Sequence, residues 1–181
     1  MILNIGSGER KLEDCINIDC EASLSPDLVC DVRKEPLPYE DSSVDEIWMI
    51  HSLEHIEMYY WEKIFKEFAR VLKPNGILLL AYPEFKECSK RFLSDSGGQR
   101  GFWRSTLYGR QLYPSDYHVV PMHSPEIKDI LETYKFYRVA YGPESEHEPH
   151  NTVLVARRNP EHITREEQIV KELHLVDAIR K

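Results

Sequence analysis

The sequence lacks a long apolar run. None of its 181 residues fall in a stretch of the roughly 20 apolar residues that a membrane-spanning helix needs. No basic segment is followed by a short apolar one, as in a signal peptide. We therefore expect a cytoplasmic protein with no membrane partner. Positive charge is also scarce, since 23 lysines and arginines stand against 31 acidic residues. An acidic chain does not attract a phosphate backbone, which argues against general nucleic-acid binding.

Cysteines are few, and their spacing does not suit a metal. The four are Cys15, Cys20, Cys30 and Cys88, with no Cys-x-x-Cys pair among them. A zinc site built from the first three is therefore disfavoured, and the cysteine spacing predicts no metal. Without a secretion signal, we expect reduced thiols that pack as small hydrophobic groups.

Glycine is also sparse, but two glycines stand close together near the start. Met1 to Ile5 is a short apolar run typical of a buried strand, and Gly6 and Gly8 end it. Glycine tolerates positive φ and lets another group approach the backbone closely. A buried strand followed by a Gly-x-Gly turn opens many nucleotide-binding α/β domains.

Alternating segments in the first half predict a mostly parallel sheet. We expect further strands at 15–20, 28–32, 44–50 and 77–82, and a helix at 59–73 that Pro74-Asn75-Gly76 ends. Only about ten residues separate Gly8 from Asp19, too few for a full helical crossover, so a short helix or a turn is expected there. The fold class is therefore α/β.

The second half is less regular. Residues 83–122 are rich in glycine, proline and aromatic residues, and we expect either a surface loop or a lid over substrate. Ser124 and Pro125 predict the start of a helix that runs to about residue 134, and strands at 136–141 and 152–156 should pair as a hairpin. Thr164-Arg-Glu-Glu167 predicts a last helix, 161–181, beyond a domain at 1–160. Its apolar face would dock on the same domain or form a homodimer, and the pattern leaves both open.

Four stretches resemble the class I S-adenosylmethionine-dependent methyltransferases, in the group called methyltransferase type 11. They occur in that family's order: Leu3-Asn-Ile-Gly-Ser-Gly8, Ile16-Asn-Ile-Asp19, Asp45-Glu-Ile-Trp-Met-Ile-His-Ser-Leu-Glu-His55 and Arg70-Val-Leu-Lys-Pro-Asn-Gly-Ile-Leu78. The resemblance implies a Rossmann-like three-layer α/β/α sandwich with an antiparallel last strand. It also implies S-adenosylmethionine as cofactor and a small-molecule methyl acceptor.

The resemblance assigns cofactor contacts by position. Gly6, Ser7 and Gly8 would pass under the methionine half, and Asp19 would accept hydrogen bonds from the ribose hydroxyls. The remaining expected contacts are Asn4, Cys20, Asp31, Val32, His51 and Ser52. Ligands of open α/β sheets gather at the carboxyl ends of the strands, and these residues are expected at such ends.

Histidines are the candidates for a base that accepts a proton from the acceptor. His51 follows the fourth predicted strand and is the first candidate, with His118 and His123 as the others. His55 and Glu84 are further candidates. Basic residues in 86–110 predict contact with an anionic or sugar-type acceptor, for which we select Arg100, Arg104 and Trp103. A solvated basic surface is the alternative.

Two other functional classes compete. A nicotinamide-dependent oxidoreductase would need a third glycine, where this chain has Arg10, and a full helix after the turn. A non-catalytic relative could bind S-adenosylmethionine, or a partner through the last helix, without turnover.

Overall fold

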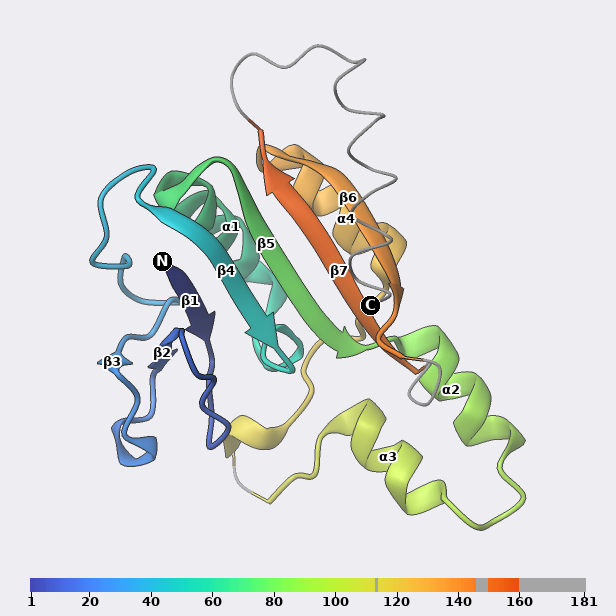
Figure 1. The fold of residues 1–181 in the computed structure, drawn as a ribbon. Coiled ribbons are helices and arrows are strands. Elements are labelled where there is room, and N and C mark those ends of the chain that lie inside the picture. The colour runs from blue at the N-terminus through green and yellow to red at the C-terminus, as the bar shows by residue number, and fades with distance from the viewer. Residues whose placement is uncertain (113, 146–149, 160–181) are drawn as a thin grey trace.

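The computed structural model describes residues 1–112, 114–145 and 150–159, which build one seven-stranded sheet of order β3-β2-β1-β4-β5-β7-β6 (Figure 1). Its strands are β1 (Ile2–Ile5), β2 (Ile16–Asp19), β3 (Leu28–Val29), β4 (Val44–Ile50), β5 (Leu72–Pro83), β6 (Phe136–Pro143) and β7 (Asn151–Arg158). Strands β1 to β5 run parallel, and β7 runs antiparallel to both of its neighbours. The predicted mostly parallel sheet with an antiparallel C-terminal hairpin is confirmed. The predicted last helix, 161–181, and the dimer through it lie outside the described residues.

Two helices cover one face of this sheet. Helix α1 (Met58–Val71) and helix α4 (Ser124–Thr133) both lie behind the sheet in Figure 1. The rings of Phe65 on α1 and Tyr134 after α4 are 6.2 Å apart, so the two helices share one core. Among the described residues, the connections between β1 and β4 contain no α-helix, only the short turn η1 (Ala22–Leu24). The opposite helical layer of the predicted sandwich is therefore not found in the described part of the chain.

The short first crossover has a polar support in place of a helix. Asn17 on β2 is buried, and its side-chain oxygen accepts hydrogen bonds from the Leu12 amide and from the side chain of Asn4, both at 2.9 Å. Its amide group donates to the Leu12 carbonyl at 3.1 Å and to Asp27 at 3.0 Å. These bonds hold the loop before β2, where a helix would otherwise carry the chain across. The predicted reduction of this crossover to a turn is confirmed.

The start of β5 differs from the prediction. Helix α1 ends at Val71 and the strand begins at once, so Pro74-Asn75-Gly76 lies within β5. The pairing with β4 shifts in register between Val44 and Glu46, which absorbs these residues. A Cβ at Gly76 would lie 2.8 Å from the Lys73 carbonyl oxygen, so glycine is required by close backbone approach.

The segment expected to be irregular contains two helices. Helix α2 (Phe85–Ser94) and helix α3 (Arg100–Tyr108) pack against each other below the right-hand part of the sheet in Figure 1. Asp95 stabilises the turn between them, because its carboxylate accepts from the amides of Gly97, Gly98 and Gln99. The sequence did not predict these helices because glycine disfavours helix formation. Two glycines lie in that turn and Gly101 lies inside α3.

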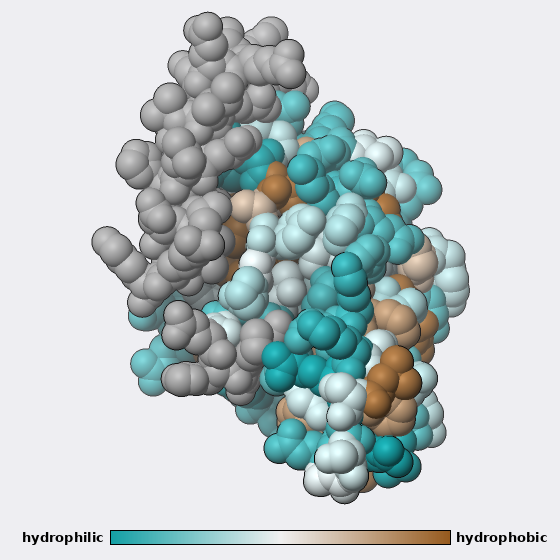
Figure 2. All heavy atoms as spheres, turned by 90° about the vertical axis from the view of Figure 1, so that its right-hand side faces the viewer, coloured by the Kyte–Doolittle hydropathy of each residue, from teal (hydrophilic) through white to brown (hydrophobic). Residues whose placement is uncertain are grey.

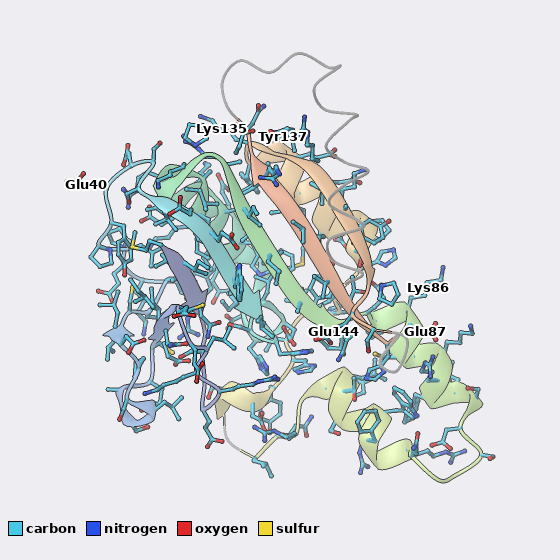
Figure 3. All side chains as sticks on the ribbon, viewed as in Figure 1. Glu40, Lys86, Glu87, Lys135, Tyr137 and Glu144 are labelled. Carbon is cyan, nitrogen blue, oxygen red and sulfur yellow. The ribbon has the colours of Figure 1, made fainter. Side chains whose placement is uncertain are left out.

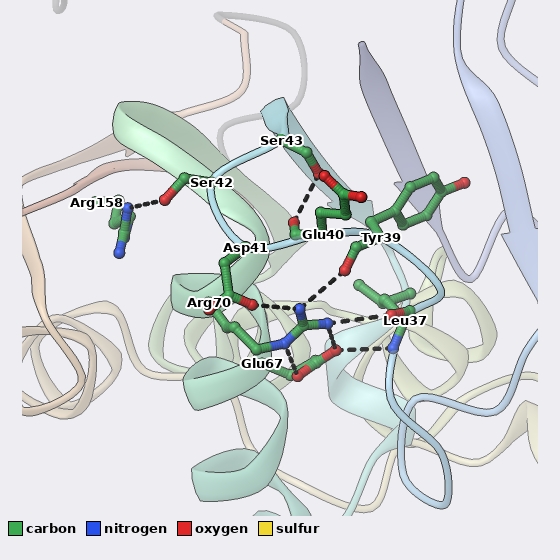
Figure 4. Close-up of polar contacts among 9 residues, drawn as sticks. All are labelled: Leu37, Tyr39, Glu40, Asp41, Ser42, Ser43, Glu67, Arg70 and Arg158. Atoms are coloured by element: carbon green, nitrogen blue, oxygen red, sulfur yellow. Dashed lines mark hydrogen bonds and ion pairs between the residues drawn. The ribbon is translucent and has the colours of Figure 1, made fainter.

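Arg70 fixes the loop between β3 and β4 to α1 (Figure 4). Its guanidinium donates to both carboxylate oxygens of Glu67, to the carbonyls of Leu37 and Tyr39, and to Asp41. Glu67 also accepts from the Leu37 amide at 2.8 Å. This network raises the pKa of Arg70 and lowers that of Glu67. Arg70 belongs to the fourth stretch of the family resemblance, and its observed contacts are structural.

The described residues on the face seen in Figure 2 are mainly polar. Figure 2 shows the side formed by β6, β7, α4 and α2, where hydrophilic residues predominate and hydrophobic ones form small patches. Among the described residues, no helix is both long enough and apolar enough to cross a bilayer.

Candidate functional site

The candidate site lies at the carboxyl ends of β1, β2 and β4. The turn after β1 is tied to β2, because the amides of Gly6 and Ser7 both donate to the carbonyl of Ile18, at 2.8 and 3.1 Å. The segment around the turn η3 (Pro114–Asp116) passes below the arrowheads of β1 and β4 in Figure 1. Residues from both halves of the chain therefore meet at this edge of the sheet.

Asp19 ends β2 beside the glycine turn. One carboxylate oxygen accepts from the Gly8 amide at 2.8 Å and the other from the Glu21 amide at 2.9 Å. The side chain is nearly buried, and each oxygen keeps a second lone pair. Such a fixed carboxylate can accept hydrogen bonds from two neighbouring hydroxyls.

Gly6 is required by its neighbour as well as by its backbone angle. It has a φ of +68°, and a Cβ placed there would lie 1.9 Å from the Ser52 hydroxyl oxygen. The glycine thus lets the turn after β1 close onto the residue that follows His51 at the end of β4. A further polar group faces this turn, because the Ser7 hydroxyl is buried and has no hydrogen-bond partner. An orphaned hydroxyl of this kind fits a site that receives a polar ligand.

The other predicted cofactor residues are more varied. Val32 is buried in the core and Cys20 is exposed. Asp31 is ion-paired with Arg33 at 2.8 Å and with Lys34 at 3.0 Å, and these cations, Arg33 first, hold the pKa of its carboxyl well below its usual range. Asn4 is buried and donates to Asn17 as described above. Asn4 and Asp31 therefore already have protein partners, and their cofactor contacts stay predictions.

His51 sits at the tip of β4 with an uncommon backbone conformation. Its φ is +51°, which is left-handed and rare for a residue with a side chain. Its Nδ1 lies 3.5 Å from a carboxylate oxygen of Glu54, in the turn η2 (Leu53–His55). The predicted base candidate is thus held between the glycine turn and a buried carboxylate.

A cluster of Glu54, His55 and His118 lies beside His51. One ligand atom of each of the three lies within 4.8 Å of the others. The rings of His55 and His118 meet edge to face, 4.7 Å apart. Burial lowers the pKa of His118, while the charge of Glu54 acts in the opposite direction. His118 is a candidate from the sequence, whereas Glu54 is not, and its signal is a carboxylate between two histidines in His-Ser-Leu-Glu-His.

His123 belongs to a different surface. Its Nδ1 lies 3.0 Å from Glu84, whose other oxygen accepts from the Ser124 amide at the start of α4. The predicted helix start at Ser124 agrees with α4, and the Glu84 carboxylate caps the helix by accepting from the Ser124 amide. His123 also borders an open groove of about 850 Å³ between α2 and α4. The structure groups His51 with His118 and leaves His123 with Glu84.

The predicted acceptor residues lie on α3. Trp103 is buried, with its ring 5.1 Å from that of His150 and with Arg91 stacked over it at 5.6 Å. Arg100 and Arg104 are exposed. Other cations of this segment are paired with acids, since Arg91 lies 2.8 Å from Glu87 and Arg110 lies 3.2 Å from Asp116. Figure 3 labels Lys86 and Glu87 on α2.

Part of the chain is similar to known methyltransferases. Residues 14–80, which extend from just before β2 into β5, match the family model described as "Methyltransferase domain". A glycine/sarcosine/dimethylglycine N-methyltransferase from Actinopolyspora halophila is 29% identical over 118 residues. This match covers 58% of the chain and 20% of that relative, so the chain spans about a fifth of the relative's length.

Solved structures share the fold at low sequence identity. A SAM-dependent methyltransferase from Archaeoglobus fulgidus superposes with a TM-score of 0.63 and 14% identity, over 86% of this chain and 85% of that one. A 1,6-didemethyltoxoflavin-N1-methyltransferase from Burkholderia thailandensis, solved with its acceptor and S-adenosylhomocysteine, gives 0.56 and 16%, over 88% and 71%. Residues 14–80 therefore resemble a methyltransferase domain, and the described chain shares the fold of these solved methyltransferase structures.

Proposed function

We propose that the chain transfers the methyl group of S-adenosylmethionine to a small-molecule acceptor, and that the cofactor is held at the carboxyl ends of β1, β2 and β4. The observation that carries this proposal is the pairing of Gly8 with Asp19. The Gly8 amide fixes a nearly buried carboxylate beside a turn that has no side chain at Gly6. A sugar that carries two adjacent hydroxyls fits such a carboxylate.

Each residue at this edge of the sheet would make a different contact with the cofactor. Asp19 would accept from the ribose hydroxyls, and the Ser7 hydroxyl would find in the ligand the partner that it lacks in the protein. Gly6 and Gly8 leave room for the ligand above the turn. When bound, S-adenosylmethionine supplies a methyl group already activated on a sulfonium sulfur.

The protein's chemical task is then to place the acceptor and receive a proton. His51, at the end of β4 and 3.5 Å from Glu54, is our candidate base for a hydroxyl or ammonium acceptor. His118 lies in the adjoining cluster and is the second candidate. His123 is the weakest of the three, because it is paired with Glu84 away from this cluster.

For the acceptor we propose a small anionic molecule. Arg100 and Arg104 are exposed on α3, beside the carboxyl edge of the sheet. The halophile relative's name gives glycine, sarcosine and dimethylglycine, which are small carboxylates. Arginine binds carboxylates with two parallel hydrogen bonds, which makes these residues suitable contacts.

Calorimetric titration with S-adenosylhomocysteine tests the proposed cofactor site. We expect the wild-type chain to bind it and not to bind NAD. Asp19→Asn should weaken binding about 10- to 100-fold, because a charge-assisted hydrogen bond is worth about 1.5–3 kcal/mol. The control is Asp129→Asn on the exposed side of α4, which should bind as the wild type does. Equal affinities in the two variants, with equal thermal midpoints, would contradict the proposal.

Binding alone does not separate an enzyme from a non-catalytic relative. Turnover of methyl-labelled cofactor with a pool of small carboxylates and amines makes that distinction. Label in an acceptor supports the enzyme. Binding without transfer to any member of the pool would favour the non-catalytic relative.

A further inference from the structure

The side chain of Glu54 is buried, and its carboxyl group has no hydrogen bond. Its residue is 1% exposed, and neither carboxylate oxygen has a hydrogen-bond partner. A carboxylate removed from water costs several kcal/mol of effective desolvation unless a cation or hydrogen-bond donors compensate it. Nδ1 of His51 lies 3.5 Å from one oxygen of the Glu54 carboxylate, which is beyond normal hydrogen-bond length. The position therefore calls for a positive partner.

Two histidines lie next to this carboxylate, and the backbone orients one of them. Nδ1 of His55 lies 2.9 Å from the Tyr117 carbonyl oxygen, which can only accept, so Nδ1 donates there and Nε2 is the ring nitrogen left to bind a metal. Burial lowers the pKa of His118, and the nearby backbone of Thr106 opposes this shift. A ring nitrogen fixed by a carbonyl while the other stays free is the usual arrangement of histidines that bind metals.

The backbone also joins the two halves of the cluster. The Val119 amide donates to the Glu54 carbonyl at 2.9 Å, and the His118 amide donates to the Tyr108 carbonyl at 3.2 Å. These bonds hold the segment around His118 against the turn that carries Glu54 and His55. The three side chains are thus supported before any ligand arrives, as a preformed site requires.

We propose that Glu54, His55 and His118 bind a divalent transition metal ion, with Zn²⁺ as the best fit. The three ligand atoms already lie within 4.8 Å of one another, and small side-chain movements would bring them around one ion. Two imidazoles and one carboxylate form a donor set that suits Zn²⁺ and related ions. A bound metal ion would be the positive partner of the Glu54 carboxylate.

An ion at this position could bind the methyl acceptor. Three protein ligands leave coordination open, and the cluster adjoins His51 at the edge where we place the methyl acceptor. An oxygen or nitrogen of the acceptor could complete the coordination there. The metal site itself does not depend on cofactor binding, so it can be tested alone.

Calorimetric titration of the full chain with Zn²⁺, after removal of metals with a chelator, tests the site. We expect one ion per chain with a Kd of about 1 µM or tighter. Glu54→Gln and His118→Ala should each weaken binding at least tenfold, and Zn²⁺ should raise the thermal midpoint of the wild type but not of these variants. Co²⁺ in place of Zn²⁺ should give a visible absorption band that the same variants lose.

The control pair is Glu84 and His123, a carboxylate and histidine 3.0 Å apart outside the cluster. His123→Ala should bind Zn²⁺ as the wild type does. Glu54→Gln, which keeps the shape of the side chain, should still bind S-adenosylhomocysteine to within about twofold, which separates this proposal from the cofactor site. No binding at about 1 mM free Zn²⁺, or undiminished binding in both cluster variants, would overturn the proposal.

Discussion

At the scale of single residues, Gly6 connects the ends of two strands. Its missing Cβ leaves room for the Ser52 hydroxyl, which lies 1.9 Å from where that atom would be, while Gly8 has open space around it. Both glycines have positive φ, so an alanine at either costs about 1–2 kcal/mol in backbone strain. Only at Gly6 does a steric clash add to this cost.

Gly6→Ala should therefore lower the free energy of unfolding more than Gly8→Ala does, as measured by urea denaturation. Adding Ser52→Gly to Gly6→Ala removes the clashing atoms and should restore part of the loss. If the two single variants were equally stable, the proximity of Gly6 and Ser52 would not exist in solution.

The thiols offer a second test at this scale. Burial raises the pKa of Cys30 to about 11 and that of Cys88 to about 12, so both stay neutral and protected at pH 8. Cys20 is exposed and follows Asp19. Peptide mapping after iodoacetamide should find Cys20 alkylated well before Cys30 or Cys88.

Cofactor binding should protect that thiol. With saturating S-adenosylhomocysteine, we expect alkylation of Cys20 to slow at least several-fold, while Cys15, which is partly exposed, reacts as before. Equal slowing at both thiols would point to a general change in the protein and would contradict a cofactor beside Asp19.

At the scale of elements, the strands were the best predicted parts. The apolar run at 44–50 predicts β4 with its observed bounds, and the spacing of Trp61, Ile64, Phe65 and Phe68 predicts the buried face of α1. The start of β5 was not predictable, because Pro-Asn-Gly ends helices and also fits a strand irregularity. Glu54 was missed because the segment that meets it, whose Val119 and Val120 amides donate to its carbonyl, is far away in sequence.

Helix α3 carries the prediction about the acceptor. Replacing both Arg100 and Arg104 with alanine should raise the KM for an anionic acceptor about tenfold or more and leave the Kd of S-adenosylhomocysteine unchanged. Steady-state kinetics with the acceptor found by the labelling screen would measure this. Lys128→Ala on α4, which removes a remote cation, is the control; unchanged kinetics in the double variant would refute the role of α3.

Arg70 binds helix α1 to the loop before β4 through hydrogen bonds. Arg70→Met should lower the free energy of unfolding by about 2 kcal/mol, because several hydrogen bonds to a charged group are lost. Lys66→Ala, which removes the exposed Lys66–Glu62 pair on the same helix, should change it little. A loss in Arg70→Met no larger than in Lys66→Ala would contradict the network.

The same network predicts a pH dependence. Arg70 lowers the pKa of Glu67, so this pair stabilises the fold above the unfolded pKa of glutamate, about 4.3, and the contribution is lost as pH falls through the lower folded value. The stability difference between wild type and Arg70→Met should therefore shrink below about pH 4. A difference that stayed constant down to pH 2 would exclude this mechanism.

At the scale of the whole molecule, the strand order brings the residues of the candidate site together. Parallel strands β1, β2 and β4 end at one edge, so Gly6, Asp19 and His51 meet although they are far apart in the chain. This much follows from the sequence, because the strand pattern and the glycine turn are local. The position of His118 does not follow from the sequence, since it depends on the backbone contact between residues 118–120 and the turn that carries Glu54.

The central claim is that these strand ends hold S-adenosylmethionine. A crystal structure of the chain with S-adenosylhomocysteine tests it most directly. We predict both ribose hydroxyls at roughly 2.7 Å from the carboxylate oxygens of Asp19, with the ligand above Gly6 and Gly8. A ligand found instead in the groove between α2 and α4, or bound with Asp19 out of its reach, would contradict the account.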